Sequence, residues 1–123
     1  AKYNIYVKEF EENEKTRRDK DMVQKLMEII KANISNADLS ADYLAGELCV
    51  SRSGLFSKVK EVTGKTPHEL IMDTRINEAV KLLDTTDKSV SDISILVGFN
   101  SPSYFSKCFT KEKGVSPYNW RKA

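Results

Sequence analysis

Apolar residues recur every three or four positions from Asp21 onward, which is the spacing that buries one face of an α-helix. The first such stripe comprises Met22, Val23, Leu26, Met27, Ile30 and Ile34. Further stripes follow to the end of the chain, and no segment alternates apolar and polar residues at every second position, as a strand does. The pattern therefore predicts an all-α fold with seven helices.

Each break between stripes carries residues that start or stop helices. Serine at an N-cap accepts a hydrogen bond from the first helical turn, and serines stand in such positions at 40, 51, 89 and 101. Thr66-Pro67-His68-Glu69 is a capping box with proline in the first helical position. Glycines at 64, 98 and 114 follow the last residues of predicted helices. Every predicted boundary thus has a local cause.

The chain contains an internal repeat, with Leu44–Gly64 matching Ile93–Gly114. Leu44 pairs with Ile93 and Leu48 with Val97, at an offset of 49 residues. We align Leu55 with Tyr104 and Phe56-Ser57-Lys58 with Phe105-Ser106-Lys107, and the offset becomes 50 after one inserted residue. Each copy is a short helix, a tight turn and a capped second helix, which is the helix-turn-helix arrangement. We expect the first at about 40–63, a linker helix at about 67–83 and the second at about 89–113.

In a helix-turn-helix, the first helix braces the second, and the second offers its outer face to the DNA major groove. The first recognition face is predicted to comprise Arg52, Ser53, Phe56, Ser57 and Lys60, with Lys58 at its edge. The second is predicted to comprise Asn100, Ser101, Ser103, Ser106, Lys107, Thr110 and Lys111. Ser51 and Ser101 start these helices, whose N-terminal N–H groups suit phosphate, and Tyr104 could offer its hydroxyl to a phosphate.

Charge supports this interpretation only locally. The net charge of +2 is too small to indicate a nucleic-acid partner, because clustering matters more than the total. The first copy carries Arg52, Lys58, Lys60 and Lys65 against Glu61, and the second carries Lys107, Lys111 and Lys113 against Glu112. A helical protein-interaction module that has lost DNA binding is the alternative, but it has no need of basic residues on both faces.

The segment from Asp92 to Phe109 (DISILVGFNSPSYFSKCF), followed by Gly114-Val115-Ser116-Pro117, resembles the AraC/XylS family of bacterial transcription regulators. Leu55–Pro67, with Arg75 and Ala79, resembles the first half of that domain. The resemblance implies two recognition helices in successive major-groove segments on one DNA face, about 34 Å apart. It also implies regulation by another domain, and activation through contact with RNA polymerase as the commoner role. The sequence of these motifs is similar to that of family members fused to two-component receivers or hybrid sensors.

Several positions depart from the family pattern. Cys49 stands where the first turn usually has glycine, and a positive φ there would cost about 1 kcal/mol. Ser94 replaces a customary alanine, and Gly54 lies inside the first recognition helix, where it allows close approach to DNA or is simply tolerated. The resemblance implies that the position of Phe56 faces DNA, where an exposed ring could touch a thymine methyl, and the alternative is that Phe56 packs against the protein. We expect Arg75 to pair with an acidic side chain between the two halves.

The aromatic residues of the second copy and the last helix invite a base-stacking role, but packing is the better interpretation. We expect Tyr104, Phe105, Phe109 and Trp120 to pack in the core or on the surface. Residues 1–20 are crowded with charge and are interpreted as a linker or a helical tail of an upstream sensory or receiver domain. The start at Ala1 without methionine suggests a fragment. The DNA-binding domain would then occupy residues 21–123.

Other function classes find little support. One histidine, two separated cysteines and no glycine-rich phosphate loop leave no catalytic or metal-binding arrangement, so we expect neither an enzyme nor a cofactor. His68 has no ligand-type neighbours and should be a surface residue, while Cys49 and Cys108 should be thiols in a reducing cytoplasm. No run of about 18 apolar residues exists, so membrane contact is not expected. The predicted partner is promoter DNA, which places the protein in the cytoplasm with the nucleoid.

Overall fold

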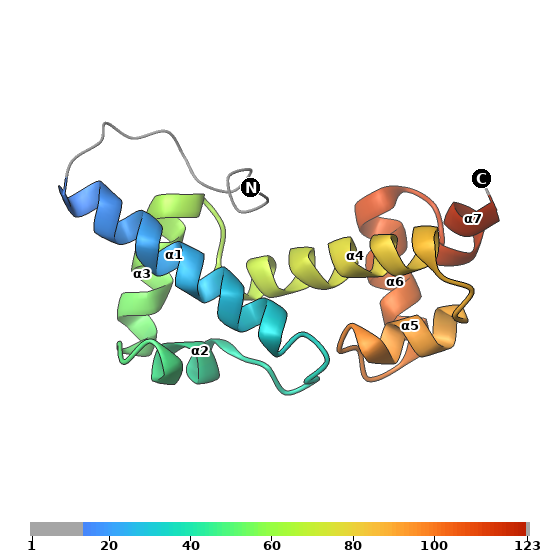
Figure 1. Ribbon diagram of the computed structural model, residues 1–123, viewed down its shortest axis with the longest axis horizontal. Coiled ribbons are helices and arrows are strands. Elements are labelled where there is room, and N and C mark those ends of the chain that lie inside the picture. Colours follow the sequence, from blue (N-terminus) through green and yellow to red (C-terminus); the bar gives the residue numbers. More distant parts are fainter. Residues whose placement is uncertain (1–13, 123) are drawn as a thin grey trace. The chain divides into compact units, whose positions relative to one another are not determined.

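The computed structural model describes residues 14–122, and within that range the chain forms seven α-helices and no strand, as predicted. Figure 1 shows their order along the chain. Their bounds are α1 Glu14–Ala32, α2 Ala41–Glu47, α3 Arg52–Thr63, α4 Pro67–Thr85, α5 Val90–Leu96, α6 Pro102–Lys113 and α7 Pro117–Lys122. None of the described helices is both long and apolar enough to cross a membrane.

These helices form two compact units. The first unit holds the described residues up to Asn33 and then Leu39–Met72, and the second holds Ile34–Asp38 and the described residues from Asp73 onward. Each unit therefore contains one of the two helix-turn-helix copies, α2–α3 or α5–α6. Helix α4 begins in the first unit and continues into the second.

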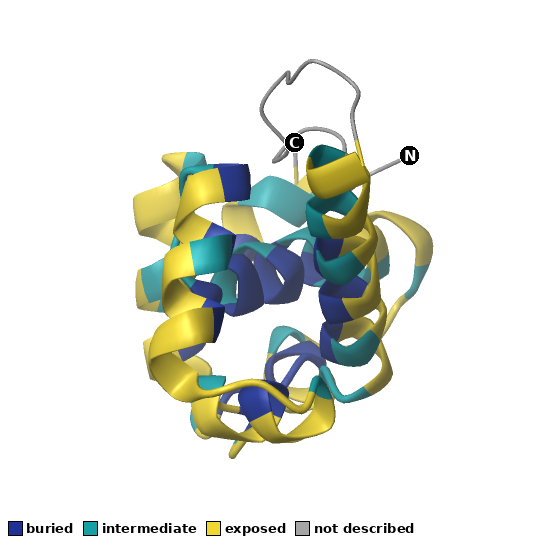
Figure 2. Ribbon diagram, turned by 90° about the vertical axis from the view of Figure 1, so that its left-hand side faces the viewer, coloured by how far each residue is buried: buried dark blue, intermediate teal, exposed yellow. Residues whose placement is uncertain are grey.

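The core of the first unit lies where α1, α2 and α3 contact one another. Its fully buried residues on these helices include Val23, Leu26, Ile30, Leu44, Leu55 and Val59. Burial of each such side chain stabilises the fold by about 1.5–3 kcal/mol relative to exposure. Leu44 braces α3 as predicted, but Leu48, predicted to be buried as well, is only half-buried. In Figure 2 the helices carry buried residues along one side and exposed residues along the other.

The core of the second unit is largely aromatic. Phe99 and Phe105 have ring centres 5.1 Å apart, Phe105 and Phe109 are 5.7 Å apart, and Phe109 and Trp120 are 5.8 Å apart. Such tilted and edge-to-face pairs add about 0.5–1.5 kcal/mol beyond the area that they bury. Phe105 and Phe109 are fully buried, so packing rather than base stacking is their role, as predicted.

The helix ends confirm the capping predictions. Ser51 Oγ accepts a hydrogen bond from Gly54 N at 3.0 Å, and Ser101 Oγ accepts one from Tyr104 N at 3.2 Å. In the capping box, Thr66 N donates to Glu69 Oε1 at 2.9 Å and Glu69 N donates to Thr66 Oγ1 at 3.1 Å. Hydrogen bonding of the Glu69 carboxylate by Thr66, through its backbone N–H first and its side chain second, lowers the pKa of Glu69. At these predicted helix starts, backbone N–H groups are thus satisfied by local hydrogen bonds.

Helix α1 starts at Glu14, ahead of the apolar stripe that begins after Asp21. The intervening residues are polar, and all but Thr16 are charged, so they give no apolar stripe. Most of them are nevertheless good helix formers, and Lys15 Nζ pairs with Asp19 Oδ2 one turn on at 3.4 Å. Part of the segment assigned to an upstream tail is therefore helix. Its remaining residues, 1–13, lie outside the described part of the chain.

Arg75 lies in the second unit and is 7% exposed. Its Nη2 donates to the backbone oxygen of Asn36 at 2.8 Å, and its guanidinium carbon lies 5.9 Å from the ring centre of Phe99. Burial lowers the pKa of this guanidinium. The prediction of an acidic partner between the two halves is therefore wrong, because the guanidinium contacts the Asn36 carbonyl and the face of Phe99, which both belong to its own unit.

The C-terminal end of α4 is closed by a residue that the sequence did not single out. Arg121 donates to the backbone oxygens of Leu83, Thr86 and Lys88, in the last turn of α4 and just after it, with distances of 3.3 and 3.0 Å for the first two. Trp120 Nε1 also donates to Asp84 Oδ1 at 3.1 Å. A guanidinium at a helix C-terminus satisfies unpaired carbonyls and complements the helix dipole.

Candidate nucleic-acid interface

The structure corrects the register of the internal repeat. Ser51 and Ser101 are both N-caps, and Leu55 and Phe105 are both fully buried four residues later, so the offset is already 50 at the caps. The inserted residue is Asn100, in the turn itself, and not a residue after Lys58 as the matching letters predict. The alignment of Phe56 with Phe105 was therefore wrong, and Phe56 corresponds to Ser106.

The two turns otherwise share one backbone design. Cys49 N donates to Gly46 O at 3.2 Å and Gly98 N donates to Ile95 O at 3.0 Å. Gly98 has φ 94° and Cys49 has φ 57°, so the cysteine adopts the left-handed conformation that favours glycine. This conformation costs a residue with a Cβ about 1–2 kcal/mol, as anticipated for this turn. The first copy accordingly carries local strain that the second avoids.

The first recognition face is one continuous exposed surface on α3. Arg52, Ser53, Phe56 and Ser57 together line a shallow depression, and Lys60 is exposed further along the helix. Phe56 is 48% exposed. Arg52 Nε lies 3.5 Å from Asp42 Oδ1, and because both side chains are at least 70% exposed this pair adds little stability. The guanidinium therefore remains available to another partner.

The second recognition face lies on α6 and in the turn before it. Ser103, Lys107, Thr110 and Lys111 are exposed on the helix, and Asn100 is exposed in the turn. Ser101 and Ser106 are half-buried, and Ser101 Oγ lies 3.5 Å from Ser103 Oγ, as Ser51 Oγ does from Ser53 Oγ in the first copy. The predicted residues of each face are thus brought together by the helix that carries them.

Tyr104 is the exposed aromatic residue of α6. The residue is 52% exposed, and its ring centre lies 5.8 Å from that of Phe99, so its packing is confined to one side. A hydrogen bond with the Cys108 thiol raises the pKa of the tyrosine hydroxyl. The hydroxyl therefore stays protonated near neutral pH and is able to donate a hydrogen bond.

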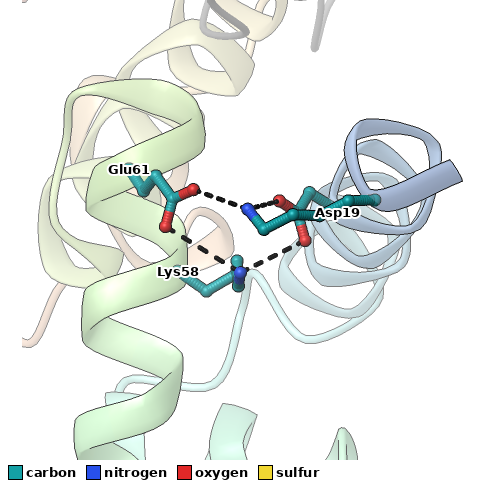
Figure 3. A network of polar contacts seen from close by, with 4 residues as sticks. Asp19, Lys58 and Glu61 are labelled. Carbon is teal, nitrogen blue, oxygen red and sulfur yellow. Dashed lines mark hydrogen bonds and ion pairs between the residues drawn. The ribbon is translucent and has the colours of Figure 1, made fainter. Parts of the chain in front are cut away.

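Lys58 differs from the other basic residues predicted to contact DNA. Figure 3 shows its ammonium between Asp19 of α1 and Glu61 of α3, at 3.3 Å from Asp19 Oδ1 and 3.8 Å from Glu61 Oε2. Lys15 Nζ closes the network from α1, at 3.0 Å from Glu61 Oε1. The hydrogen bonds of Lys15 with Glu61 and Asp19 raise its pKa. This network ties the N-terminal turns of α1 to the recognition helix of the first unit.

Gly54 has a structural explanation within the cap of α3. A Cβ on this residue would lie 2.9 Å from Ser51 Oγ, which accepts the hydrogen bond from Gly54 N. The glycine thus leaves space for the capping hydroxyl of Ser51. Its counterpart, Tyr104, donates to its own cap with a side chain in place, so that cap accommodates a Cβ.

Sequence reasoning missed Asp19, Asp42 and Arg121. Asp19 was recognisable in part, because its spacing from Lys15 is that of a helical ion pair, but its contact with Lys58 crosses from one helix to another. Asp42 and Arg121 act across the fold, and no local pattern marks them. Within the described residues, no group of three or more histidine, cysteine or acidic side chains is placed to hold a metal ion.

Comparisons with known proteins agree with this geometry. A family model described as a helix-turn-helix domain matches residues 44–123. A protein described as histidine kinase P4, from Formosa agariphila, is 39% identical over 103 residues, which are 84% of this chain and 8% of that protein. The chain thus spans a small part of this relative.

Two solved structures extend the comparison. The C-terminal domain of AraT, a response regulator from Geobacillus stearothermophilus, superposes with a TM-score of 0.78 at 31% identity, over 82% of this chain and 84% of that one. The DNA-binding domain of AdpA, described as the global transcriptional factor and solved with a target DNA, superposes with a TM-score of 0.73 at 25% identity, over 85% and 89% of the two chains. With its two capped helix-turn-helix copies, this chain belongs to the AraC-type family of helix-turn-helix transcription regulators, a family of DNA-binding domains rather than enzymes.

Proposed function

We propose that this domain binds double-stranded promoter DNA sequence-specifically by placing α3 and α6 in the major groove. The observation that carries the proposal is the repetition of one design. In each unit a short helix packs against a capped second helix, whose outer face is exposed and bears polar or basic side chains. A protein-interaction module would not need exposed basic side chains on the outer faces of both helices, as Lys60 and Lys107 are here.

The residues of the two faces divide by chemistry. Lys60, Lys111 and Arg52 carry exposed charges suited to phosphates, which supply most of the affinity and none of the sequence preference. Lys107 and the short polar residues at the centre of each face are suited to base edges. The hydroxyls and amide nearest the helix starts are suited to backbone contacts, and these are Ser51, Asn100, Ser101 and Tyr104. Base-edge candidates are Ser53, Ser57, Ser103, Ser106 and Thr110.

We expect the two helices to occupy successive major-groove segments on one side of the duplex, about one helical turn apart. Two tandem copies in one chain, each with its own recognition face, support this expectation. Selection of bound sequences from random DNA tests it. Two short conserved elements spaced by about 10 base pairs would agree with the proposal, and a single short element would contradict it.

A fluorescence-anisotropy titration of the selected site at several salt concentrations tests DNA binding itself. Each phosphate neutralised by a lysine or arginine contributes about −0.9 to the slope of log affinity against log salt concentration. Several basic residues on two faces predict a steep slope, together with a preference for the selected site over scrambled DNA. A flat salt response, or no binding to any duplex, would refute DNA binding and favour a protein-interaction module.

The domain is proposed to act as the output part of a larger bacterial regulator. The relatives described as a histidine kinase and a response regulator support an upstream sensory or receiver domain as its partner. Activation through RNA polymerase is the role that the family resemblance implies, and a cytoplasmic, nucleoid-associated location follows from the proposed target. Transcription from a promoter carrying the selected site, with and without the longer protein, tests the direction of regulation.

A further inference from the structure

Phe56 is an exposed aromatic side chain on the first recognition face, and the fold does not account for it. The apolar side of α3 is formed by Leu55, Val59 and Val62, which are at most 1% exposed, whereas Phe56 is 48% exposed. Among the described residues, the ring–ring contacts all fall in the second unit and none includes Phe56. The core of the first unit is therefore complete without this ring.

The corrected repeat register sharpens this point. An alignment of Phe56 with Phe105 would make an aromatic residue there a requirement of the fold, because Phe105 is fully buried. In the structure Phe105 corresponds to Leu55, and the second copy has Ser106 where the first has Phe56. The same backbone position thus accepts a small polar residue, so the phenylalanine is specific to the first recognition face.

We propose that Phe56 makes α3 a reader of thymine, by packing its ring against the C5-methyl group of one thymine in the major groove. This inference rests on the proposed DNA binding and adds its chemical preference in the first half-site. The thymine methyl is the apolar group that the base pairs present in the major groove, so it is the natural partner of an exposed ring. Covering both surfaces removes apolar area from water.

The surroundings of Phe56 suit this contact. Ser53 and Ser57 flank it in the same shallow depression, and their short side chains leave the ring as the bulkiest apolar group there. Arg52 lines the depression as well, and its exposed guanidinium is able to contact a phosphate or a neighbouring guanine. The face therefore combines one apolar contact with one cation, whereas the second face has a serine in place of the ring.

Replacing thymine by deoxyuridine tests the proposal, because uracil lacks only the methyl group. Each thymine of the selected site is changed in turn, and affinity is measured by anisotropy with the whole chain. The wild type should lose about three- to tenfold at one thymine, the range expected for one buried methyl group. Phe56→Ala should bind the thymine and uracil forms of that position equally, while Phe56→Leu should retain part of the difference.

Two control variants make the result specific. Lys60→Ala and Ser106→Ala should alter overall affinity or other positions but leave the thymine-to-uracil ratio at this position unchanged. Because Phe56 is exposed, Phe56→Ala should keep the far-ultraviolet circular dichroism of the wild type. If no thymine shows the loss, or if Phe56→Ala still shows it, thymine reading by Phe56 is overturned while DNA binding stands. If the wild type binds no duplex at any salt concentration, both proposals fail.

Discussion

Gly98 follows Val97, the C-cap of α5, and lies in the turn that leads to the second recognition helix. Its replacement by alanine tests how closely that turn is packed. The residue has φ 94°. A Cβ at this position would lie 2.2 Å from the backbone oxygen of Ile34 and 2.8 Å from Arg75 Nε. Non-bonded carbon contacts are favourable at about 3.5–4.0 Å, so the methyl group of Gly98→Ala would overlap a backbone atom that has little freedom to move.

Two costs add in this variant. The left-handed conformation costs a residue with a Cβ about 1–2 kcal/mol. Forcing an extra methyl group into a packed site costs about 1–3 kcal/mol, through shifts of the backbone and of side chains. We therefore expect Gly98→Ala to lower the free energy of unfolding by about 2–5 kcal/mol, a large part of the roughly 5–15 kcal/mol that a domain possesses.

Urea unfolding followed by circular dichroism measures this loss, and two glycines of the same chain separate its parts. Gly114 has φ 81° but open space around its Cβ position, so Gly114→Ala should lose only about 1–2 kcal/mol. Gly46 lies within α2 and also faces open space, so Gly46→Ala should gain about 0.5–1 kcal/mol. If Gly98→Ala is no more destabilised than Gly114→Ala, the close approach of Ile34 and Arg75 is not what requires the glycine.

Four further outcomes follow from the structure. Lys58→Ala should leave the salt slope of DNA binding nearly unchanged, because the Lys58 ammonium is already paired with Asp19 and Glu61. Lys60→Ala should make the slope shallower by about 0.9, and equal slopes for the two variants would contradict this difference. Lys107→Ala should cost about 1–3 kcal/mol of binding energy and relax preference at one base pair, and a uniform loss across sequences would assign Lys107 to phosphate instead. Arg121→Ala leaves carbonyls at the end of α4 without their donor and should lower the free energy of unfolding by about 1–3 kcal/mol. Lys122→Ala, one residue further along the chain, should change the free energy of unfolding little, and comparable urea midpoints for the two variants would show that solvent replaces the guanidinium. The pKa of Glu69 is lowered in the folded chain, so its contribution to stability is present above the ordinary value of 4.5 and is lost as pH falls through the lowered pKa. Glu69→Gln should therefore flatten the acid side of the profile of stability against pH. An unchanged profile would show that the capping carboxylate does not cause the loss of stability in acid.

Much of the fold was predictable because its signals are local. A serine N-cap, a capping box and a glycine C-cap each join residues three or four positions apart, so Ser51, Thr66 and Gly64 marked their helix ends without tertiary information. The repeat was also visible, but its register was misjudged by one residue, because Phe56-Ser57-Lys58 and Phe105-Ser106-Lys107 match in letters. Burial of Leu55 and Phe105, which depends on the surrounding helices, decides the true alignment.

The sequence by itself determined the helices, their boundaries apart from the start of α1, the two tandem copies and the polar character of both recognition faces, because periodicity and capping act over a few residues. Only the tertiary structure decided which side chains on those faces are engaged elsewhere. It placed Lys58 against Asp19, gave Arg75 a carbonyl 39 residues away in sequence, and left Phe56 exposed while the neighbouring Leu55 is buried. Such contacts depend on which helix faces meet after packing, and a pattern read along one helix does not contain that information.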